Sequence, residues 1–207
     1  MLDASLRPLL APFLARMAVT FHARGISANQ VTAAGFFFSL LAFLALAFVC
    51  YGWALFFLVC GRLMDGLDGP LARLSTPTDL GGFLDIVSDF VFYSGIVFFF
   101  AVGRPEVALP AAFLIFAFVG SGSSFLAYAI IAAKKGLRDD RQGAKSFIYL
   151  GGLTEGSESI AALAACCLFP DSFSPIAYGF GALCWLTTIG RVRRAVIDFA
   201  PTLADGR

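Results

Sequence analysis

Four aspartates lie close together near the middle of the sequence, at Asp65, Asp68, Asp85 and Asp89. Asp65 and Asp68 are three residues apart and Asp85 and Asp89 are four apart, so in two helices each pair would share one face. Four carboxylates that converge repel each other unless a cation neutralises them. Oxygen ligands without histidine or cysteine favour Mg²⁺, Mn²⁺ or Ca²⁺ over zinc. The pattern therefore predicts a divalent-cation site.

Small residues and an arginine follow the first pair of acids. Gly66, Gly69 and Ala72 leave room for a ligand to approach the backbone. Arg73 lies one turn after Gly69, where its guanidinium could bind a phosphate oxygen. Because Mg²⁺ in proteins keeps positions for substrate phosphates, these residues favour a phosphate-containing ligand. The alternative is a cluster of salt bridges that involves Arg73 and Arg62, but four acids outnumber these two cations.

The composition indicates which kind of protein positions these residues. Of the 207 residues, 59% are hydrophobic, 24 are phenylalanine and only 14% are charged, where about 25% charged is usual for a soluble domain. These values exclude a disordered chain, a coiled coil and an ordinary cytosolic enzyme. No basic stripe is present, so we expect no nucleic-acid partner.

Six apolar stretches are long enough to cross a bilayer as helices, which takes about 20 residues. They cover residues 29–50, 53–72, 82–103, 107–133, 147–169 and 174–196. None alternates with the period of two that barrel strands show. We therefore predict an all-α integral membrane protein with six transmembrane helices, preceded by an N-terminal amphipathic helix at the interface. The expected organisation is a juxtamembrane helix over 1–24, a membrane domain over 25–197 and a cytoplasmic tail over 198–207.

The distribution of basic residues predicts the orientation of this membrane domain. With the N-terminus inside, thirteen of the fifteen Lys and Arg residues lie on the cytoplasmic side, Arg62 lies within a span, and only Arg104 is outside. Cytoplasmic loops carry the excess of Lys and Arg. We therefore expect both termini and the aspartates to face the cytoplasm. We expect the membrane to be the bacterial inner, or cytoplasmic, membrane.

The aspartates belong to a longer motif that closely resembles the signature of the CDP-alcohol phosphotransferase family. The motif reads Asp65-x2-Asp68-Gly69-x2-Ala72-Arg73-x7-Gly81-x3-Asp85-x3-Asp89. Many members have eight residues between the Arg and the next Gly, and here there are seven. The segment GISANQVTAAGFF (25–37) also resembles the lead into the family's first helix, with Ala28 in place of the usual proline.

This resemblance implies an activity that the acids alone do not specify. Family members transfer a substituted phosphate group from a CDP-linked donor, such as CDP-diacylglycerol, to an alcohol and release CMP. They use two divalent metals, here Mg²⁺ or Mn²⁺. By position, Asp65, Asp68 and Asp85 would be metal ligands. Asp89 would complete the second metal site and act as the general base, with Asp85 as the next candidate.

The resemblance also assigns the donor site. Gly69, Ala72 and Arg73 would line the CDP site, with Arg73 against the diphosphate. Asn29 and Thr32 are weaker candidates for contacts to the nucleotide. We also expect a homodimer.

A second polar cluster, KSFIYLGGLTEGSES (145–159), opens the fifth predicted span. We interpret it as part of the acceptor site, although a polar seam between helices or a dimer contact would have the same composition. Acceptor-binding candidates are Lys135, Arg138, Lys145, Glu155 and Glu158. The basic residues suit a phosphate-bearing acceptor and the two glutamates a cationic or zwitterionic one. A soluble CDP-alcohol donor with diacylglycerol as acceptor is a further arrangement.

A divalent-cation transporter is the competing interpretation, because carboxylates within spans would also serve transport. Transporters usually bind their ions near the bilayer midplane between two repeats. Here the acids cluster at the predicted cytoplasmic ends of two spans, and no second half of the chain repeats them. These features favour the enzyme.

Overall fold

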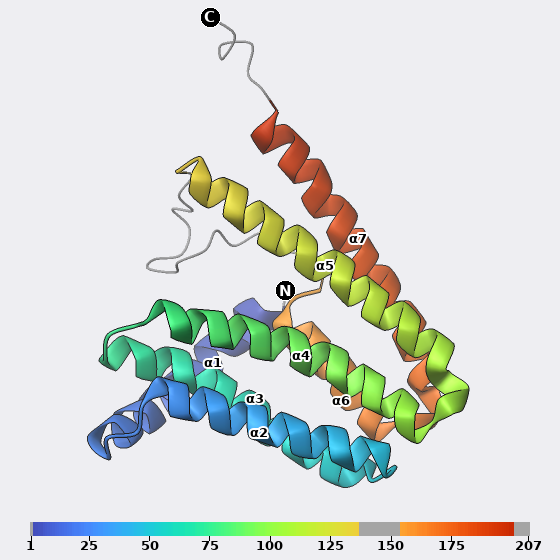
Figure 1. Cartoon of the computed structure of the whole chain (residues 1–207), viewed down its shortest axis with the longest axis horizontal. Coiled ribbons are helices and arrows are strands. Elements are labelled where there is room, and N and C mark those ends of the chain that lie inside the picture. Colours follow the sequence, from blue (N-terminus) through green and yellow to red (C-terminus); the bar gives the residue numbers. More distant parts are fainter. Residues whose placement is uncertain (1, 137–153, 201–207) are drawn as a thin grey trace, which may run out of the picture.

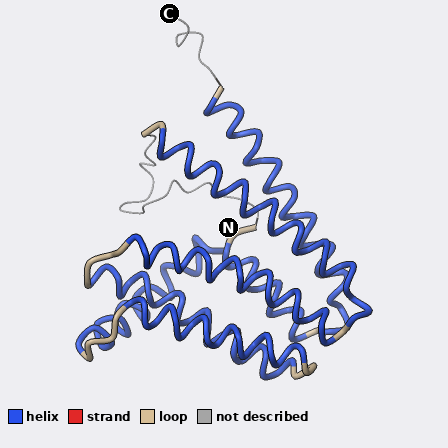
Figure 2. Tube along the Cα trace, viewed as in Figure 1, coloured by secondary structure: helices blue, strands red, loops and turns tan. Residues whose placement is uncertain are grey.

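The computed structural model describes residues 2–136 and 154–200, and every regular element in these residues is a helix (Figure 2). Long helices alternate with short connections, and two of the connections are single 3₁₀ turns. The elements are α1 (Leu2–Ala23), α2 (Ala28–Ala47), α3 (Tyr51–Leu74), α4 (Asp79–Gly103), η1 (Pro105–Val107), α5 (Ala108–Lys134), α6 (Gly156–Leu168), η2 (Pro170–Ser172) and α7 (Phe173–Phe199). The predicted all-α class is confirmed.

Three helical segments are long and apolar enough to cross a membrane: α2, α4 and Pro105–Lys134, which joins η1 to α5. α3 and α7 are as long, but charged residues interrupt their apolar runs. α6 is a shorter apolar helix. It begins at Gly156, and residues 147–153 of the fifth predicted span lie outside the described residues. Six spans therefore remain a prediction.

The surface of the described helices is rich in apolar side chains. Phe37, Trp53, Phe83 and Phe116 are each more than half exposed. An aqueous surface rarely presents so many large apolar groups together. In lipid these side chains are stable, and the helices satisfy their backbone hydrogen bonds internally.

The starts of α2 and α4 are fixed by side chains close to their N-termini. Ser27 caps α2, where its hydroxyl accepts from the Gln30 amide (3.3 Å) and the Gln30 side chain accepts from the Ser27 amide (2.9 Å). The Thr78 hydroxyl accepts from the Gly81 amide at 3.1 Å and so begins α4. Such caps satisfy amides that have no partner within the helix. They fix where α2 begins and where α4, which carries Asp85 and Asp89, begins.

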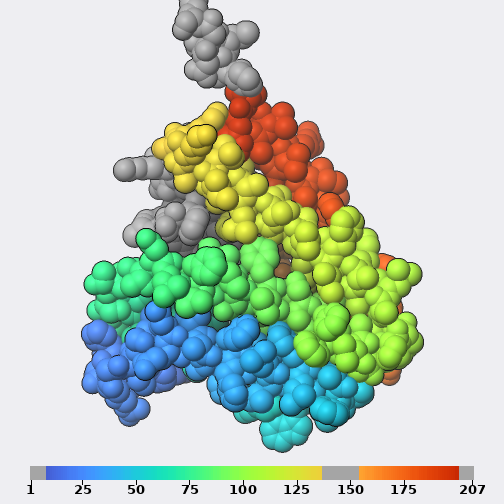
Figure 3. Space-filling view, in the orientation of Figure 1, coloured from blue at the N-terminus to red at the C-terminus, as the bar shows by residue number. Residues whose placement is uncertain are grey.

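The helices form two packed groups, one that includes α1 to α4 and one that includes α5 and α7. α2 packs against both α3 and α4, and α1 packs against α3. α5 and α7 run side by side, and their ends at Lys134 and Phe199 extend away from α2 and α3 (Figure 1). On the face shown in Figure 3, α4 lies between α2 and α5.

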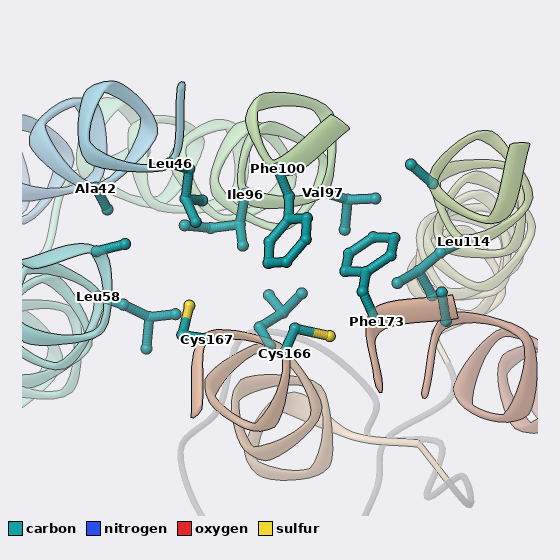
Figure 4. Packing of buried hydrophobic residues seen from close by; sticks show 14 of the residues in the cluster. Ala42, Leu46, Leu58, Ile96, Val97, Phe100, Leu114, Cys166, Cys167 and Phe173 are labelled. Atoms are coloured by element: carbon teal, nitrogen blue, oxygen red, sulfur yellow. The ribbon is translucent and has the colours of Figure 1, made fainter. Parts of the chain in front are cut away.

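The main core lies where α2, α3, α4, α5, α6 and α7 meet (Figure 4). The rings of Phe100 and Phe173 stack there with centroids 4.2 Å apart. Leu58 of α3 and Cys166 of α6 are buried in the same cluster. Removing one such side chain from water contributes about 1.5–3 kcal/mol in a soluble protein. In a bilayer close packing takes over this role, because lipid is as apolar as leucine.

A second, smaller core fixes the N-terminal helix. Ala18 of α1 is buried with Val31, Leu67 and Leu71. α1 continues through Pro8 and Pro12, and the side chain of Leu9 on it is 77% exposed. One face of α1 thus contacts α3 beside the aspartates, and apolar groups remain outside. The interfacial position of α1 stays a prediction.

Two glycines allow α2 and α3 to approach closely. A β-carbon at Gly35 would lie 3.3 Å from the carbonyl oxygen of Gly61, and one at Gly61 would lie 3.2 Å from that of Gly35. Small residues at a helix crossing permit this distance between backbones. The crossing lies one turn before Asp65, so it sets how near α2 comes to the candidate site.

Ion pairs and hydrogen bonds of side chains connect elements at both ends of α5 and α7. Arg104, the one basic residue predicted outside, pairs with Glu106 (2.6 Å) and Asp171 (3.2 Å) and donates to the Pro170 carbonyl (2.9 Å). It therefore connects η1 to η2. At the other end of α5 and α7, the hydroxyl of Tyr128 and Nε of Arg194 donate to Asp198 at 2.6 and 2.7 Å. These bonds lower the pKa of the Asp198 carboxyl.

Candidate metal centre and substrate site

Three of the four aspartates converge. Carboxylate oxygens of Asp65 and Asp68 from α3 and of Asp85 from α4 all lie within 4.8 Å of one another. α2 packs against both α3 and α4, whereas α3 and α4 make little direct contact with each other among the described residues. The acids therefore face each other across the end of a hairpin rather than from a tight helix pair. Three hard oxygen donors at this spacing fit a divalent cation such as Mg²⁺ or Mn²⁺.

The fourth aspartate joins this group through an arginine. Nη1 of Arg62 lies 2.5 Å from Oδ1 of Asp89 and 3.3 Å from Oδ2 of Asp65. Asp89 is not one of the three acids whose oxygens converge. The predicted cluster of four carboxylates thus consists of a triad and an arginine-linked acid, with Asp65 in contact with both parts. The sequence places Arg62 within a predicted span and includes it in the alternative of a salt-bridge cluster, but it does not predict the bond to Asp89.

Two residues of α2 lie at the site. The Thr32 hydroxyl donates to Oδ2 of Asp68 at 2.6 Å, and both residues are buried. The Asn29 side-chain oxygen lies next to Gly81, where a β-carbon would be 3.0 Å from it. Thr32 was predicted as a nucleotide contact, and its observed role is to orient a candidate metal ligand. Contacts of Asn29 and Thr32 with a nucleotide stay a prediction.

The predicted donor-binding residues occupy the last turns of α3. Gly69 and Ala72 are partly exposed and Arg73 is exposed. Nη1 of Arg73 lies near Gly69, where a β-carbon would be 3.7 Å from it. The arginine therefore lies over a position without a side chain, one turn after Asp68. This arrangement leaves backbone and guanidinium accessible from the same side of α3.

The predicted acceptor residues fall into two groups. Arg138 and Lys145 lie outside the described residues. Glu158 accepts from the Glu155 amide at 3.2 Å and so caps α6, and Lys135 is exposed with its ammonium 5.6 Å from the Phe199 ring centroid. The two glutamates thus have a local structural role, and their contact with an acceptor stays a prediction.

A polar seam joins α7 to the segment before α6. The sequence predicted only part of it. Thr154 donates from its amide to the Thr187 hydroxyl at 3.2 Å, and their hydroxyls lie 3.0 Å apart. Further along α7, Arg191 donates to the Ser121 carbonyl of α5 at 2.8 Å. Buried polar groups of this kind are stable only when hydrogen-bonded. The seam includes residues of the predicted polar cluster, which favours the helix-seam interpretation for Thr154.

Comparison with known proteins bears on this arrangement. The sequence model of the CDP-alcohol phosphatidyltransferase family matches residues 25–190. The chain belongs to this family. The match includes the converging triad and the arginine-linked Asp89, so all four carboxylates lie within the matched region. Family membership supports a transferase of phospholipid synthesis and leaves its donor and acceptor open.

Two curated proteins are similar to the chain. It is 47% identical over 196 residues to Inner membrane protein YnjF of Escherichia coli (strain K12). The aligned region covers 93% of this chain and 94% of that protein. It is 35% identical over 101 residues to Archaetidylinositol phosphate synthase of Pyrococcus horikoshii. That aligned region covers 48% of this chain and 54% of the synthase. The first similarity extends over nearly the whole chain, and the second over about half of it.

Proposed function

We propose that this family member transfers a substituted phosphate group, in the first instance phosphatidyl, from a CDP-linked donor to the hydroxyl of an alcohol and releases CMP. The observation that carries the proposal is the convergence of Asp65, Asp68 and Asp85 within the matched family unit. The similarity to a synthase of a phosphate-containing lipid supports it. So does the position of the acids near the ends of α3 and α4, where a soluble nucleotide and lipid tails can both reach.

In this reaction Asp65, Asp68 and Asp85 would hold the divalent cation. When bound, a cation there polarises a phosphoryl oxygen and stabilises the leaving oxygen of CMP. Thr32 holds Asp68 in its orientation through the 2.6 Å hydrogen bond. Arg73 offers two parallel N–H donors to the diphosphate. Gly69 and Ala72 keep the approach to the backbone open.

Asp89 is the candidate general base. Bond formation between the acceptor oxygen and the phosphorus requires that the hydroxyl lose its proton, and a carboxylate within reach can accept it. The bond from Arg62 to Oδ1 fixes the side chain of Asp89. α4 carries Asp89 one turn from Asp85, so the base would lie beside the metal ligands.

The activity test uses purified chain with CDP-diacylglycerol and Mg²⁺ or Mn²⁺. A panel of phosphorylated, zwitterionic and neutral alcohols is supplied, and CMP is measured. We expect metal-dependent CMP formation with one class of alcohol. A second arm supplies soluble CDP-alcohols with diacylglycerol and tests the reversed arrangement. No CMP in either arm, together with Mn²⁺ entry into vesicles that contain the chain, would support the transporter instead.

We further propose that α2–α7 cross the inner membrane and that both termini face the cytoplasm. The distribution of Lys and Arg supports this orientation. The similarity to an inner membrane protein of a bacterium supports the choice of membrane. In a parent in which Cys50 is replaced by serine, Glu106→Cys should react with a membrane-impermeant maleimide added outside intact cells. Asp79→Cys should react only after the membrane is opened. The opposite pattern would reverse the orientation.

A further inference from the structure

Arg62 is a buried cation inside the group of aspartates. It lies one turn before Asp65 on α3, and its side chain is 8% exposed. Its Nη1 reaches Asp89 on α4 (2.5 Å) and Asp65 on its own helix (3.3 Å). One guanidinium therefore bridges carboxylates of the two helices that form the candidate metal centre.

Aromatic rings hold this guanidinium in place. Its central carbon lies 3.9 Å from the centroid of Phe92, which is fully buried, and 5.9 Å from that of Tyr93. A planar guanidinium stacks on such rings, and an ammonium does not do so equally well. Nε of Arg62 is buried and has no hydrogen-bond partner among the described residues. The side chain is thus fixed by the rings and the two acids together.

The position of this charge divides the aspartates. Asp65, Asp68 and Asp85 form the converging triad. Arg62 holds Asp89 outside it at 2.5 Å, and Asp65 lies farther from the same nitrogen, at 3.3 Å. A buried charge is stable only when it is paired, so Arg62 and Asp89 stabilise each other. A divalent cation at Asp89 would meet a guanidinium that carries the same sign of charge and already occupies one of its carboxylate oxygens.

We propose that Arg62 is a built-in counter-cation that occupies the place of a second metal ion at Asp89. The substrate-free chain then binds one divalent cation, at Asp65, Asp68 and Asp85. This inference rests on the proposed function for the identity of the site, but metal binding tests it without any turnover. It makes Arg62 a positioning residue for Asp89 and a determinant of metal number.

The test is a titration of the purified chain with Mn²⁺ in the absence of nucleotide, with free Mn²⁺ measured by electron paramagnetic resonance. We expect one bound ion per wild-type chain. Arg62→Gln should bind a second ion, because the competing charge is removed and Asp89 is released. Arg62→Lys should still bind one ion, because the charge is kept. Arg104→Gln removes an ion-paired arginine at the opposite end of α4, and we expect it to bind one ion as well.

A further variant keeps the inference testable if Arg62→Gln does not fold. Asp89→Asn in the wild-type background does not depend on Arg62→Gln and should leave the single ion in place. Where Arg62→Gln does fold, adding Asp89→Asn to it should remove the second ion. Two ions of similar affinity in the wild type, or loss of the single ion in Asp89→Asn, would overturn the role of Arg62. A wild-type chain that binds no ion would contradict the metal centre itself, and with it this inference.

Discussion

Replacing Asp65, Asp68 or Asp85 by asparagine should reduce CMP release to the level measured without the protein. Each substitution exchanges a charged oxygen for an amide among three donors that lie within 4.8 Å of one another. Hard divalent cations bind carboxylates far better than amides in a site with so few ligands. Binding of Mn²⁺ to the substrate-free chain should weaken in the same three variants. CMP release and Mn²⁺ binding can be measured on one preparation.

Asp171→Asn provides the matched control for this prediction. The same chemical change is made at an aspartate that is 96% exposed and lies in η2 beside Arg104, in contact with none of the three converging acids. We expect full CMP release from that variant. Full activity in any of the three site variants would remove that residue from the ligand set, whereas loss of activity in Asp171→Asn would point to a general effect on folding.

Asp89→Asn should lower turnover by roughly the 10²–10⁴-fold that is typical of a lost general base. Asparagine keeps the shape of the side chain, and its amide oxygen can still accept the hydrogen bond from Arg62. It cannot take up the proton of the acceptor alcohol. Affinity for the CDP donor should fall far less, because Arg73 and the converging triad remain. CMP release measures turnover, and a nucleotide titration measures donor affinity.

Two results would contradict this role. If donor affinity collapses together with turnover, Asp89 is chiefly a metal ligand, as the family resemblance also allows. If neither quantity changes, the base lies elsewhere and Asp85 is the next candidate. The two results require opposite outcomes of the nucleotide titration, so that measurement separates them.

The sequence predicted the converging acids because their spacing is local. Asp65 and Asp68 share a helix face by the period of the α-helix alone, and Asp85 and Asp89 do so for the same reason. The short connection between Leu74 and Asp79 then brings the two helices together. Three of the four acids converge as this reasoning requires.

The contacts that sequence reasoning missed join residues far apart in the chain. Arg62 and Asp89 are separated by 27 residues, and Thr32 and Asp68 by 36. No helical period relates residues so far apart. They come together because α2 packs against both α3 and α4. A signal was present for Arg62, because a charge within an apolar span requires a partner. The partner's identity depended on the tertiary structure.

The acceptor region shows another limit of sequence reasoning. Glu155 and Glu158 were interpreted by charge, yet in the structure their spacing of three residues serves the start of α6. An acid three residues after a helix boundary is also a capping signal. Charge alone could not separate this local role from a role in binding.

The contact between Gly35 and Gly61 has a consequence for protein engineering. Alanine in place of a helical glycine usually stabilises a helix by about 1 kcal/mol. Here a new β-carbon at either position would meet the opposite carbonyl oxygen at 3.2–3.3 Å and would drive α2 and α3 apart. The hydrogen bond between Thr32 and Asp68 crosses the same interface. Libraries that aim at thermostable variants should keep both glycines, because the gain in helix propensity would be lost if the candidate metal ligands were misaligned.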